Sequence, residues 1–470
     1  MRIAALLALL AAPFAAQAAK PNVLFIFADD HAYDAVHALG GSEVRTPNLD
    51  RLAAGGAVFT HAYNMGSWSG AVCVASRTML ITGRTVWRAN EVYGKKTEAE
   101  RAAGRLWPPM RSQAGYATAM TGKWHITADA EKCFDVVKDL RAGMPKDTKA
   151  AYGRPTSPDH DEWSPYDTAL GGYWQGGKHW SEVVGDNAVG FLDAAKGSSR
   201  PFFAYVAFNA PHDPRQSPKE YVDLYPREKV AVPVSFQPEY PNAKAIGAGK
   251  GLRDEDLAPF PRTELAVRTH RQEYYAIITH MDAQIGRILD ALERNGQAKD
   301  TLIIFTADHG LAVGRHGLMG KQNMHDHSLR VPFIVKGPGV TAGARLDAPI
   351  YLQDAMATAL DVAGAERQPQ VEFRSVLPLL RGDQSGRRDA IYGGYLELQR
   401  AVIQDGWKLI AYPKAGAFRL YHVAQDPEEL KDLAADPALR DRRAALFARL
   451  TALQQELGDK LDLSAMASLL

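Results

Sequence analysis

The sequence predicts an α/β protein with a large, mostly parallel or mixed central sheet flanked by helices, followed by a small C-terminal α+β subdomain. Three observations support this fold class. Several apolar, β-branched runs have the length of buried strands and end in polar residues. Helical patterns or long crossovers separate these runs, as parallel strands require. From about residue 384 the pattern changes to short strands with tight turns, which predicts antiparallel strands and a final helix.

Length and charge limit the class of protein. A chain of 470 residues can hold one catalytic domain and a small appended one, and we expect these at 19–383 and 384–470. The formal net charge is only +1. This balance argues against a nucleic-acid partner and leaves an anionic substrate to be recognised by local charge.

The N-terminal residues have the pattern of a secretory signal. Met1-Arg2 precedes the apolar run 3–12 and the small-residue site Ala16-Gln17-Ala18. A membrane anchor is the alternative, but an apolar run of about ten residues is too short to cross a bilayer. We therefore predict cleavage near Ala19 and a soluble protein without a stable membrane anchor, secreted to the periplasm of a bacterium.

N-terminal sequencing of secreted material tests the predicted cleavage near Ala19, and an intact Met1 on membrane-retained protein would contradict it.

The first strand is expected at 22–28 and ends in Asp29-Asp30-His31. Ligands collect at the carboxyl ends of strands in open α/β sheets, so two adjacent acids there suggest a site. A solvated turn is the alternative. A short helix is then expected at 46–52 and a strand at 57–63.

The stretch 73–84 predicts a helix that begins at Cys73 and ends at Gly83, a residue that tolerates positive φ. The N-terminus of a helix favours negative charge, so a nucleophile or an anionic ester group suits position 73. Arg77, one turn later, can fold back over the same point. Taken alone, the pattern is better explained by a buried structural cysteine beside a surface arginine, and the rest of the chain is what favours a site.

A helix at 106–114 and a strand at 116–120 lead to Gly122-Lys123-Trp124-His125, whose Lys123 and His125 can both face a site. The stretch 128–196 reads as irregular, and its aromatic residues either stack on sugars or pack in the core. These aromatic residues are Trp163, Tyr166, Tyr173, Trp174 and Trp180.

The run 202–208 is the next expected strand, and His212 just beyond it is suited to acid–base chemistry. The long segment 213–262, rich in Pro and charge, is expected to be a substrate-facing loop. The remaining expected elements are a helix at 273–292, strands at 302–307 and 330–335, a Gly-rich segment at 314–321 that carries Lys321, strands at 390–395, 401–403, 407–412 and 418–422, and a helix at 439–457.

Two cysteines, Cys73 and Cys133, could pair in an oxidising compartment. A disulfide would use up the thiol of Cys73, whose place at a helix N-terminus suits a nucleophile. We therefore expect both to be free, with Cys133 acting as a small buried hydrophobe.

Acids at two strand ends, Asp29, Asp30 and Asp308, would meet within a group of otherwise cationic residues. Three carboxylates that lie together call for a hard divalent cation with oxygen ligands. The sequence therefore predicts a metal site at the carboxyl edge of the sheet.

The stretch around Cys73 resembles the maturation motif of the formylglycine-dependent (type I) sulfatases of the alkaline phosphatase superfamily, C/S-x-P/A-S-R followed by a helix ending in L-x-T-G. Cys73, Ala75, Ser76, Arg77, Leu80, Thr82 and Gly83 match. The segments T-P-N-L-D-x-L at 46–52 and G-K-x-H at 122–125 also resemble this family, in the same order. Ala75 stands where the commoner motif has proline, so the outcome of modification depends on the maturation enzyme of the host.

The resemblance implies a mechanism and a set of site residues. Cys73 would be oxidised by a formylglycine-generating maturation enzyme, and the hydrated aldehyde would attack the sulfur of a sulfate ester. The implied metal ligands are Asp29, Asp30, Cys73, Asp308 and His309, and the implied catalytic residues are Cys73, Arg77, Lys123, His125, His212 and Lys321, of which Lys123, His212 and Lys321 would hold the sulfate. The family usually binds Ca²⁺, and His309, where Asp or Asn is commonest, leaves Mg²⁺ or Mn²⁺ open.

The implied substrate is a sulfated small molecule or glycan, and the aromatic and histidine residues of 128–200, 213–262 and 323–327 favour a sugar. Two other functions remain open. A phosphonate monoester or phosphodiester hydrolase can use the same fold, since fold does not fix function. An unmodified Cys73 would leave a secreted, glycan-binding protein without catalysis.

Overall fold

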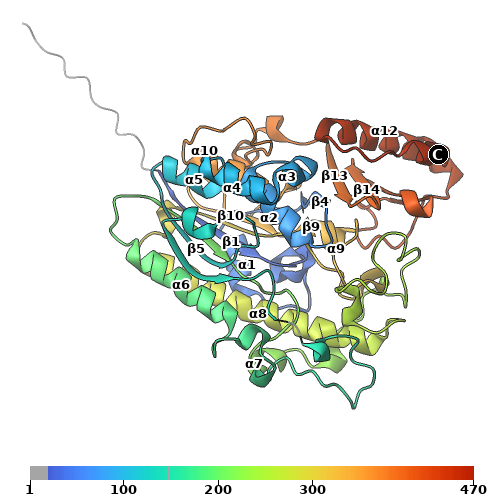
Figure 1. Ribbon diagram of the computed structural model, residues 1–470, viewed down its shortest axis with the longest axis horizontal. Helices are drawn as coiled ribbons and strands as arrows, with labels where there is room; N and C mark the ends of the chain where they lie inside the picture. The colour runs from blue at the N-terminus through green and yellow to red at the C-terminus, as the bar shows by residue number, and fades with distance from the viewer. Residues whose placement is uncertain (1–19, 147) are drawn as a thin grey trace, which may run out of the picture.

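The computed structural model describes residues 20–146 and 148–470, so the expected signal segment 1–18 lies outside the described residues. The architecture is the predicted one. A mixed eight-stranded sheet with the strand order β11-β2-β10-β8-β1-β7-β5-β6 forms the centre, and helices cover both of its faces (Figure 1). A five-stranded sheet and the long helix α12 stand at one end of the molecule.

The strands form three sheets. The central sheet contains β1 (Asn22–Ala28), β2 (Ala57–Phe59), β5 (Ala117–Lys123), β6 (Val136–Arg141), β7 (Phe202–Ala207), β8 (Thr301–Ala307), β10 (Phe333–Lys336) and β11 (Ala344–Leu346). A small sheet contains β3 (Ala62–Tyr63), β9 (Arg330–Val331) and β12 (Ile350–Tyr351). The end sheet contains β4 (Gly66–Ser67), β13 (Ala390–Tyr395), β14 (Gln399–Gln404), β15 (Trp407–Tyr412) and β16 (Ala417–Tyr421).

The α-helices are α1 (Pro47–Ala54), α2 (Val72–Thr82), α3 (Val86–Val92), α4 (Lys95–Ala102), α5 (Trp107–Gln113), α6 (Trp180–Ala194), α7 (Lys219–Val222), α8 (Glu264–Arg294), α9 (Asp326–Leu329), α10 (Asp354–Val362), α11 (Leu377–Leu380), α12 (Arg440–Leu457) and α13 (Ser464–Ala467). In Figure 1 α6 and α8 run together below the central sheet, and α2, α5 and α10 lie above it. None of the helices in the described part of the chain is long and apolar enough to cross a membrane.

The middle of the central sheet is parallel, and this sets the position of the site. β1 pairs in parallel with β8 on one side and β7 on the other, and β5 continues the parallel order beyond β7. Ala28 at the end of β1 lies opposite Ala307 at the end of β8. The segments that follow these four strands therefore leave the sheet at the same edge.

The structure corrects three expectations. The stretch 128–196, expected to be irregular, contains β6 and the 15-residue helix α6. β6 is a largely exposed edge strand with the polar sequence VVKDLR, so it lacks the apolar run that marks a buried strand. The expected single strands at 57–63 and 330–335 are each interrupted, and their two halves belong to different sheets.

The end sheet is not made from the C-terminal residues alone. β4, directly ahead of α2, pairs in parallel with β13, with Gly66 opposite Gly394. A Cβ on Gly66 would lie 1.9 Å from the carbonyl oxygen of Gly394, so this close approach requires glycine. The division of the chain at residue 384 stays a prediction, and β4 fixes the C-terminal sheet beside the segment that leads into α2.

Asp282 of α8 fixes the start of α1. Its Oδ1 accepts a hydrogen bond from the Leu49 N–H at 2.8 Å, and its Oδ2 accepts from the Asn48 N–H at 3.0 Å and the Asn48 side-chain amide at 2.9 Å. The carboxylate is 1% exposed and satisfies donors that the first turn of a helix leaves free. We expect Asp282→Ala to lower the free energy of unfolding by about 1–3 kcal/mol in urea titrations.

A matched control lies on the same helix. Asp290 pairs with Arg51 of α1 at 2.6 Å, but its side chain is 54% exposed. Asp290→Ala should change the free energy of unfolding by less than about 0.5 kcal/mol. Equal losses for the two variants would show that capping by Asp282 is not what holds α1.

Candidate active site

The residues predicted from the strand ends meet at the carboxyl edge of the central sheet. Asp29 and Asp30 follow β1, and Asp308 and His309 follow β8. The Asp30 N–H donates to Asp308 Oδ1 at 3.1 Å, which ties the two strand ends together. Asp30 adopts a φ of 63°, a conformation seldom taken outside glycine, and it turns the chain at this point.

Cys73 lies in the first turn of α2 and faces these acids. Its Sγ lies 3.4 Å from His309 Nε2 and 4.0 Å from Asp30 Oδ1, and Lys321 Nζ approaches it to 3.7 Å. Gly83 ends α2 as predicted, with a φ of 72° and its N–H bonded to the carbonyl of Met79. The helix thus presents the cysteine at its positive end, beside a group of charged side chains.

The two cysteines have opposite electrostatic environments. Burial alone would raise the pKa of the Cys73 thiol, but Lys123, Lys321 and His309 lower it well below its ordinary value. Burial raises the pKa of the Cys133 thiol to about 12. Both are buried and unpaired, as expected. Only Cys73 lies where a thiolate, the reactive form, is stabilised.

The carboxylates at the strand ends repel one another. Burial, and then the charge of Asp308, raise the pKa of Asp29 well above its ordinary value. Burial acts in the same direction on Asp308, but His309 and Arg77 outweigh it and lower the pKa of Asp308 to about 2. Burial opposes protonation of His309, yet Asp308 and Asp30 raise its pKa to about 9. A concentration of negative charge in a buried place is therefore balanced by neighbouring cations.

Arg77 and Lys123 supply part of this balance. Arg77 Nε donates to Asp308 Oδ2 at 3.0 Å, and its Nη1 donates to the Lys123 carbonyl at 3.0 Å. Lys123, the last residue of β5, forms a close ion pair with Asp29. Both cations are fully buried. Arg77 is thus not a surface residue, and it holds the end of β8 against the end of β5.

His212 and Lys321 come from different loops and meet over Asp30. Lys321 Nζ donates to both oxygens of Asp30, at 3.0 and 2.8 Å, and lies 3.3 Å from His212 Nε2. His212 Nδ1 donates to the carbonyl of Asp213 at 2.6 Å, which leaves Nε2 facing the site. The Tyr173 hydroxyl donates to the His212 carbonyl at 3.1 Å and supports this loop from behind.

His125 lies at the rim and is half-buried, with a φ of 58°. Burial lowers its pKa, against a hydrogen bond with Cys73 that raises it. All of the predicted site residues therefore lie within this one group. Gly70 and Ala71, just before α2, are exposed, so the chain reaches solvent within three residues of Cys73.

Two acids that the sequence analysis missed belong to the same group. Asp254 Oδ2 lies 3.5 Å from Lys321 Nζ, and Asp213 forms a close ion pair with Arg253. Asp213 directly follows His212 and could have been noticed for that reason. Asp254 lies in the charged segment 213–262, where no local pattern separates it from its neighbours.

The donor set suits a hard divalent cation. One ligand atom from each of Asp29, Asp30, Cys73 and His309 lies within 4.8 Å of the others, and Oδ1 of Asp29 is buried without a hydrogen-bond partner among the described residues. Asp308 adds a third carboxylate, bonded to the Asp30 N–H. Carboxylate oxygens that surround a point are the ligands such a cation prefers.

The segments expected to line the substrate side differ from expectation in part. Trp163, Tyr173 and Trp180 are buried and pack in the interior, whereas Tyr166 is exposed and Trp174 half-buried. The segment 323–327 is buried as well. Core packing, the alternative that was left open for the aromatic residues, therefore holds for three of the five.

Comparison with known proteins gives a consistent result. A model of the family described as Sulfatase matches residues 21–365, and one described as N-sulphoglucosamine sulphohydrolase, C-terminal, matches residues 314–456. The chain is 24% identical over 486 residues to the N-acetylglucosamine-6-O-sulfatase of Bacteroides thetaiotaomicron, covering 89% of this chain and 81% of the relative.

Two solved structures share the fold. BT4656, in complex with its substrate D-glucosamine-2-N,6-O-disulfate, superposes with a TM-score of 0.72 at 22% identity and covers 94% of this chain and 99% of its own. The phosphonate monoester hydrolase SpPMH from Silicibacter pomeroyi superposes with a TM-score of 0.74 at 21% identity, covering 94% of this chain and 96% of its own. At 21–22% identity, the similarity to these two structures shows a shared fold and no more.

Proposed function

Because this chain belongs to the sulfatase family and is a sulfuric ester hydrolase, we propose that it releases sulfate from a sulfated carbohydrate by means of a formylglycine formed from Cys73. The observation that carries this proposal is the setting of Cys73. The residue lies at the N-terminus of α2, within contact distance of His309 and Lys321, and opposite two carboxylates. A nucleophile, a metal site and cations for an anionic ester thus occupy one place.

The chain's own residues divide the chemistry among them. Lys123, His212 and Lys321 would hold the sulfate oxygens. A hydroxyl of the hydrated aldehyde at residue 73 would pass its proton to a carboxylate at the strand ends and attack sulfur. His212 or Lys321 donates a proton to the departing alcohol oxygen. His125 then takes the proton of the remaining hydroxyl, the carbon–oxygen bond to sulfate breaks, and the aldehyde returns. Arg77, fixed between Asp308 and the end of β5, orients the residue.

The metal is assigned to Asp29, Asp30, Cys73, Asp308 and His309, and we propose Ca²⁺, with Mg²⁺ or Mn²⁺ as the alternatives. A divalent cation held there would draw electron density from the sulfate oxygens and balance the three carboxylates. Lys123 and Lys321, which pair with Asp29 and Asp30 in this structure, are then free to turn to the substrate.

The proposed substrate class rests on the relatives and on Tyr166. N-acetylglucosamine 6-sulfate is the substrate named for one relative, and a disulfated glucosamine for one structural neighbour. Tyr166 is 42% exposed, and exposed aromatic rings are suited to stack on sugars. A panel of sulfated mono- and oligosaccharides should therefore give higher kcat/KM than choline sulfate, and the reverse order would contradict a sugar substrate.

A phosphonate monoester or phosphodiester hydrolase is the second candidate, supported by the similarity to SpPMH. One preparation should be assayed with an aryl sulfate and with the matching aryl phosphonate and phosphodiester. We expect the higher kcat/KM for the sulfate. A preference for either phosphorus ester would replace the first proposal.

The pKa of His125 predicts the acid side of the pH profile. Burial lowers this pKa from its ordinary value of 6.5, so the neutral imidazole that accepts a proton persists below pH 6.5 and is lost only as the pH falls through the lowered pKa. We expect kcat to fall in acid with a midpoint below 6.5, and this limb to disappear in the residual activity of His125→Ala. A midpoint above 6.5 would assign the base to another group.

The proposed reaction requires conversion of Cys73 to formylglycine by a second enzyme. The protein is proposed to meet a formylglycine-generating enzyme that accepts Ala75 in place of proline, and to act after secretion to the periplasm. Expression in a strain without such an enzyme should yield folded but inactive protein.

A further inference from the structure

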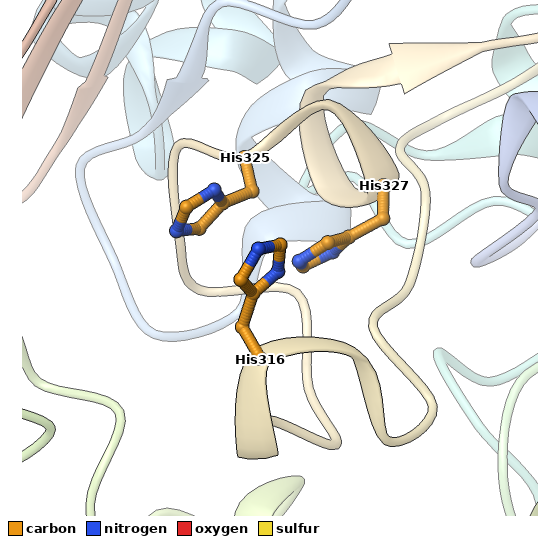
Figure 2. Close-up of side chains that lie close together, drawn as sticks. All are labelled: His316, His325 and His327. Atoms are coloured by element: carbon orange, nitrogen blue, oxygen red, sulfur yellow. The ribbon is translucent and has the colours of Figure 1, made fainter. Parts of the chain in front are cut away.

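Three histidines that the proposed mechanism does not use lie together in the interior. His316, His325 and His327 are 6%, 0% and 8% exposed. One ring nitrogen from each lies within 4.8 Å of the other two, and Figure 2 shows a nitrogen of His316 facing one of His327. None of these residues is among those assigned to the active-site cation.

Each of the three histidines has one ring nitrogen held by a hydrogen bond. His316 Nε2 donates to the carbonyl of Glu429 at 3.1 Å, His325 Nε2 bonds with the Tyr240 hydroxyl at 3.1 Å, and His327 Nδ1 bonds with Ser328 Oγ at 2.9 Å. Of the other three nitrogens, His316 Nδ1 and His327 Nε2 are buried and find no hydrogen-bond partner in the part of the chain described, and His325 Nδ1 faces Glu429 Oε2 at 3.2 Å. Metal-binding histidines show this arrangement, since the second nitrogen fixes the ring.

The carboxylate of Glu429 lies beside the three histidines, with Oε2 3.2 Å from His325 Nδ1.

Backbone strain supports a role for His316. Its φ of 54° and ψ of 21° fall in the left-handed region, which residues other than glycine seldom adopt. His316 lines one cavity of about 440 Å³ and His327 lines another of about 250 Å³, with Glu429 in the wall of both.

From this geometry we propose that His316, His325 and His327 form a second metal site for a transition-metal cation that prefers nitrogen ligands, such as Zn²⁺. Glu429 would act as a fourth ligand by giving up its contact with the Asp326 N–H or with Lys408. This site differs in chemistry from the oxygen-rich active site and does not depend on the proposed reaction.

Binding requires a small rearrangement. Nitrogen ligands at about 2.0–2.1 Å from a tetrahedral zinc lie about 3.4 Å apart. The rings of His316 and His325 are stacked at 4.2 Å with an interplanar angle of 13°, so the ring of His325 has to turn for its nitrogen to point at the same ion. His316 and His325 flank Lys321 in the chain, so the metal would restrain the loop that carries this lysine.

The test uses the whole protein with the active-site cation removed by the background substitution Asp308→Asn. We expect this protein, loaded with Zn²⁺ and dialysed, to keep about one equivalent of zinc by atomic emission, and Co²⁺ in its place to give the visible absorption of a tetrahedral site. His316→Gln and His327→Gln should weaken zinc binding by about 100-fold or more and abolish the Co²⁺ band.

His37→Gln is the matched control, because His37 is an exposed histidine outside the cluster, and it should leave both readouts unchanged. Zinc should also raise the Tm of the background protein but not that of His316→Gln. A background protein that retains no zinc and shows no Co²⁺ band would overturn the proposal even if the histidine variants failed to fold. Full zinc retention by folded His316→Gln and His327→Gln would overturn it as well.

Discussion

Cys73→Ala should lower kcat/KM for sulfate esters by on the order of 10⁴- to 10⁶-fold while the protein folds normally. Cys73 is 3% exposed and small, so alanine removes little packing. The loss follows from the chemistry of the leaving group. Neither a thiol nor a plain hydroxyl at residue 73 can expel sulfate by elimination, whereas a hydrated aldehyde can, so repeated turnover depends on the modified residue.

Mass spectrometry of the peptide that contains residue 73 measures the modification directly. We expect activity across preparations to rise in proportion to the fraction of formylglycine. Cys133→Ala is the matched control, since Cys133 is also buried but its thiol pKa is raised, and this variant should retain activity. Rapid repeated turnover by protein whose residue 73 is entirely unmodified cysteine would refute the mechanism.

Asp308→Ala should abolish both the active-site metal and turnover, with a loss of about 10³-fold or more in kcat/KM. Asp308 is one of three buried carboxylates at the strand ends, and its removal takes away a charged ligand. The change also leaves Arg77 without the partner that accepts from its Nε at 3.0 Å. Arg77 would keep only the longer ion pair with Asp29 at 3.8 Å, and loss of a buried partner is costly, so we expect the alanine variant to be less stable by about 3–5 kcal/mol.

Asp308→Asn separates these two effects. Asparagine keeps an oxygen for Arg77 and lacks the charge, so this variant should fold and still lose most of the active-site Ca²⁺, measured by atomic emission. Asp300→Ala is the control, because Asp300 is an exposed acid at the opposite end of β8. Full metal content and turnover in Asp308→Asn would show that the metal lies elsewhere.

The two substitutions distinguish the function from its alternatives. Loss of activity in both supports a metal-dependent hydrolase with a nucleophile at residue 73. A protein that binds sulfated glycans without turnover, and whose binding is unchanged by Cys73→Ala, would instead fit the non-catalytic alternative.

The sequence by itself determined the elements whose local pattern is strong. Apolar runs of strand length specified β1, β7 and β8, because a strand buried on both faces needs apolar residues throughout. Gly83 specified the end of α2, because glycine accepts the left-handed conformation found there. Since parallel strands share a carboxyl edge, the acids after β1 and β8 could also be expected to meet.

Only the tertiary structure decided which distant segments touch. The edge strand β6 is polar and exposed, so its sequence gives no buried-strand signal. Asp254 reaches Lys321 at 3.5 Å, and Glu429 lies against His325 at 3.2 Å, across separations that no periodicity reports. The histidines at 325 and 327 looked like substrate-facing residues in the sequence and are buried in the structure, because burial depends on what packs over a loop and not on the loop's own residues.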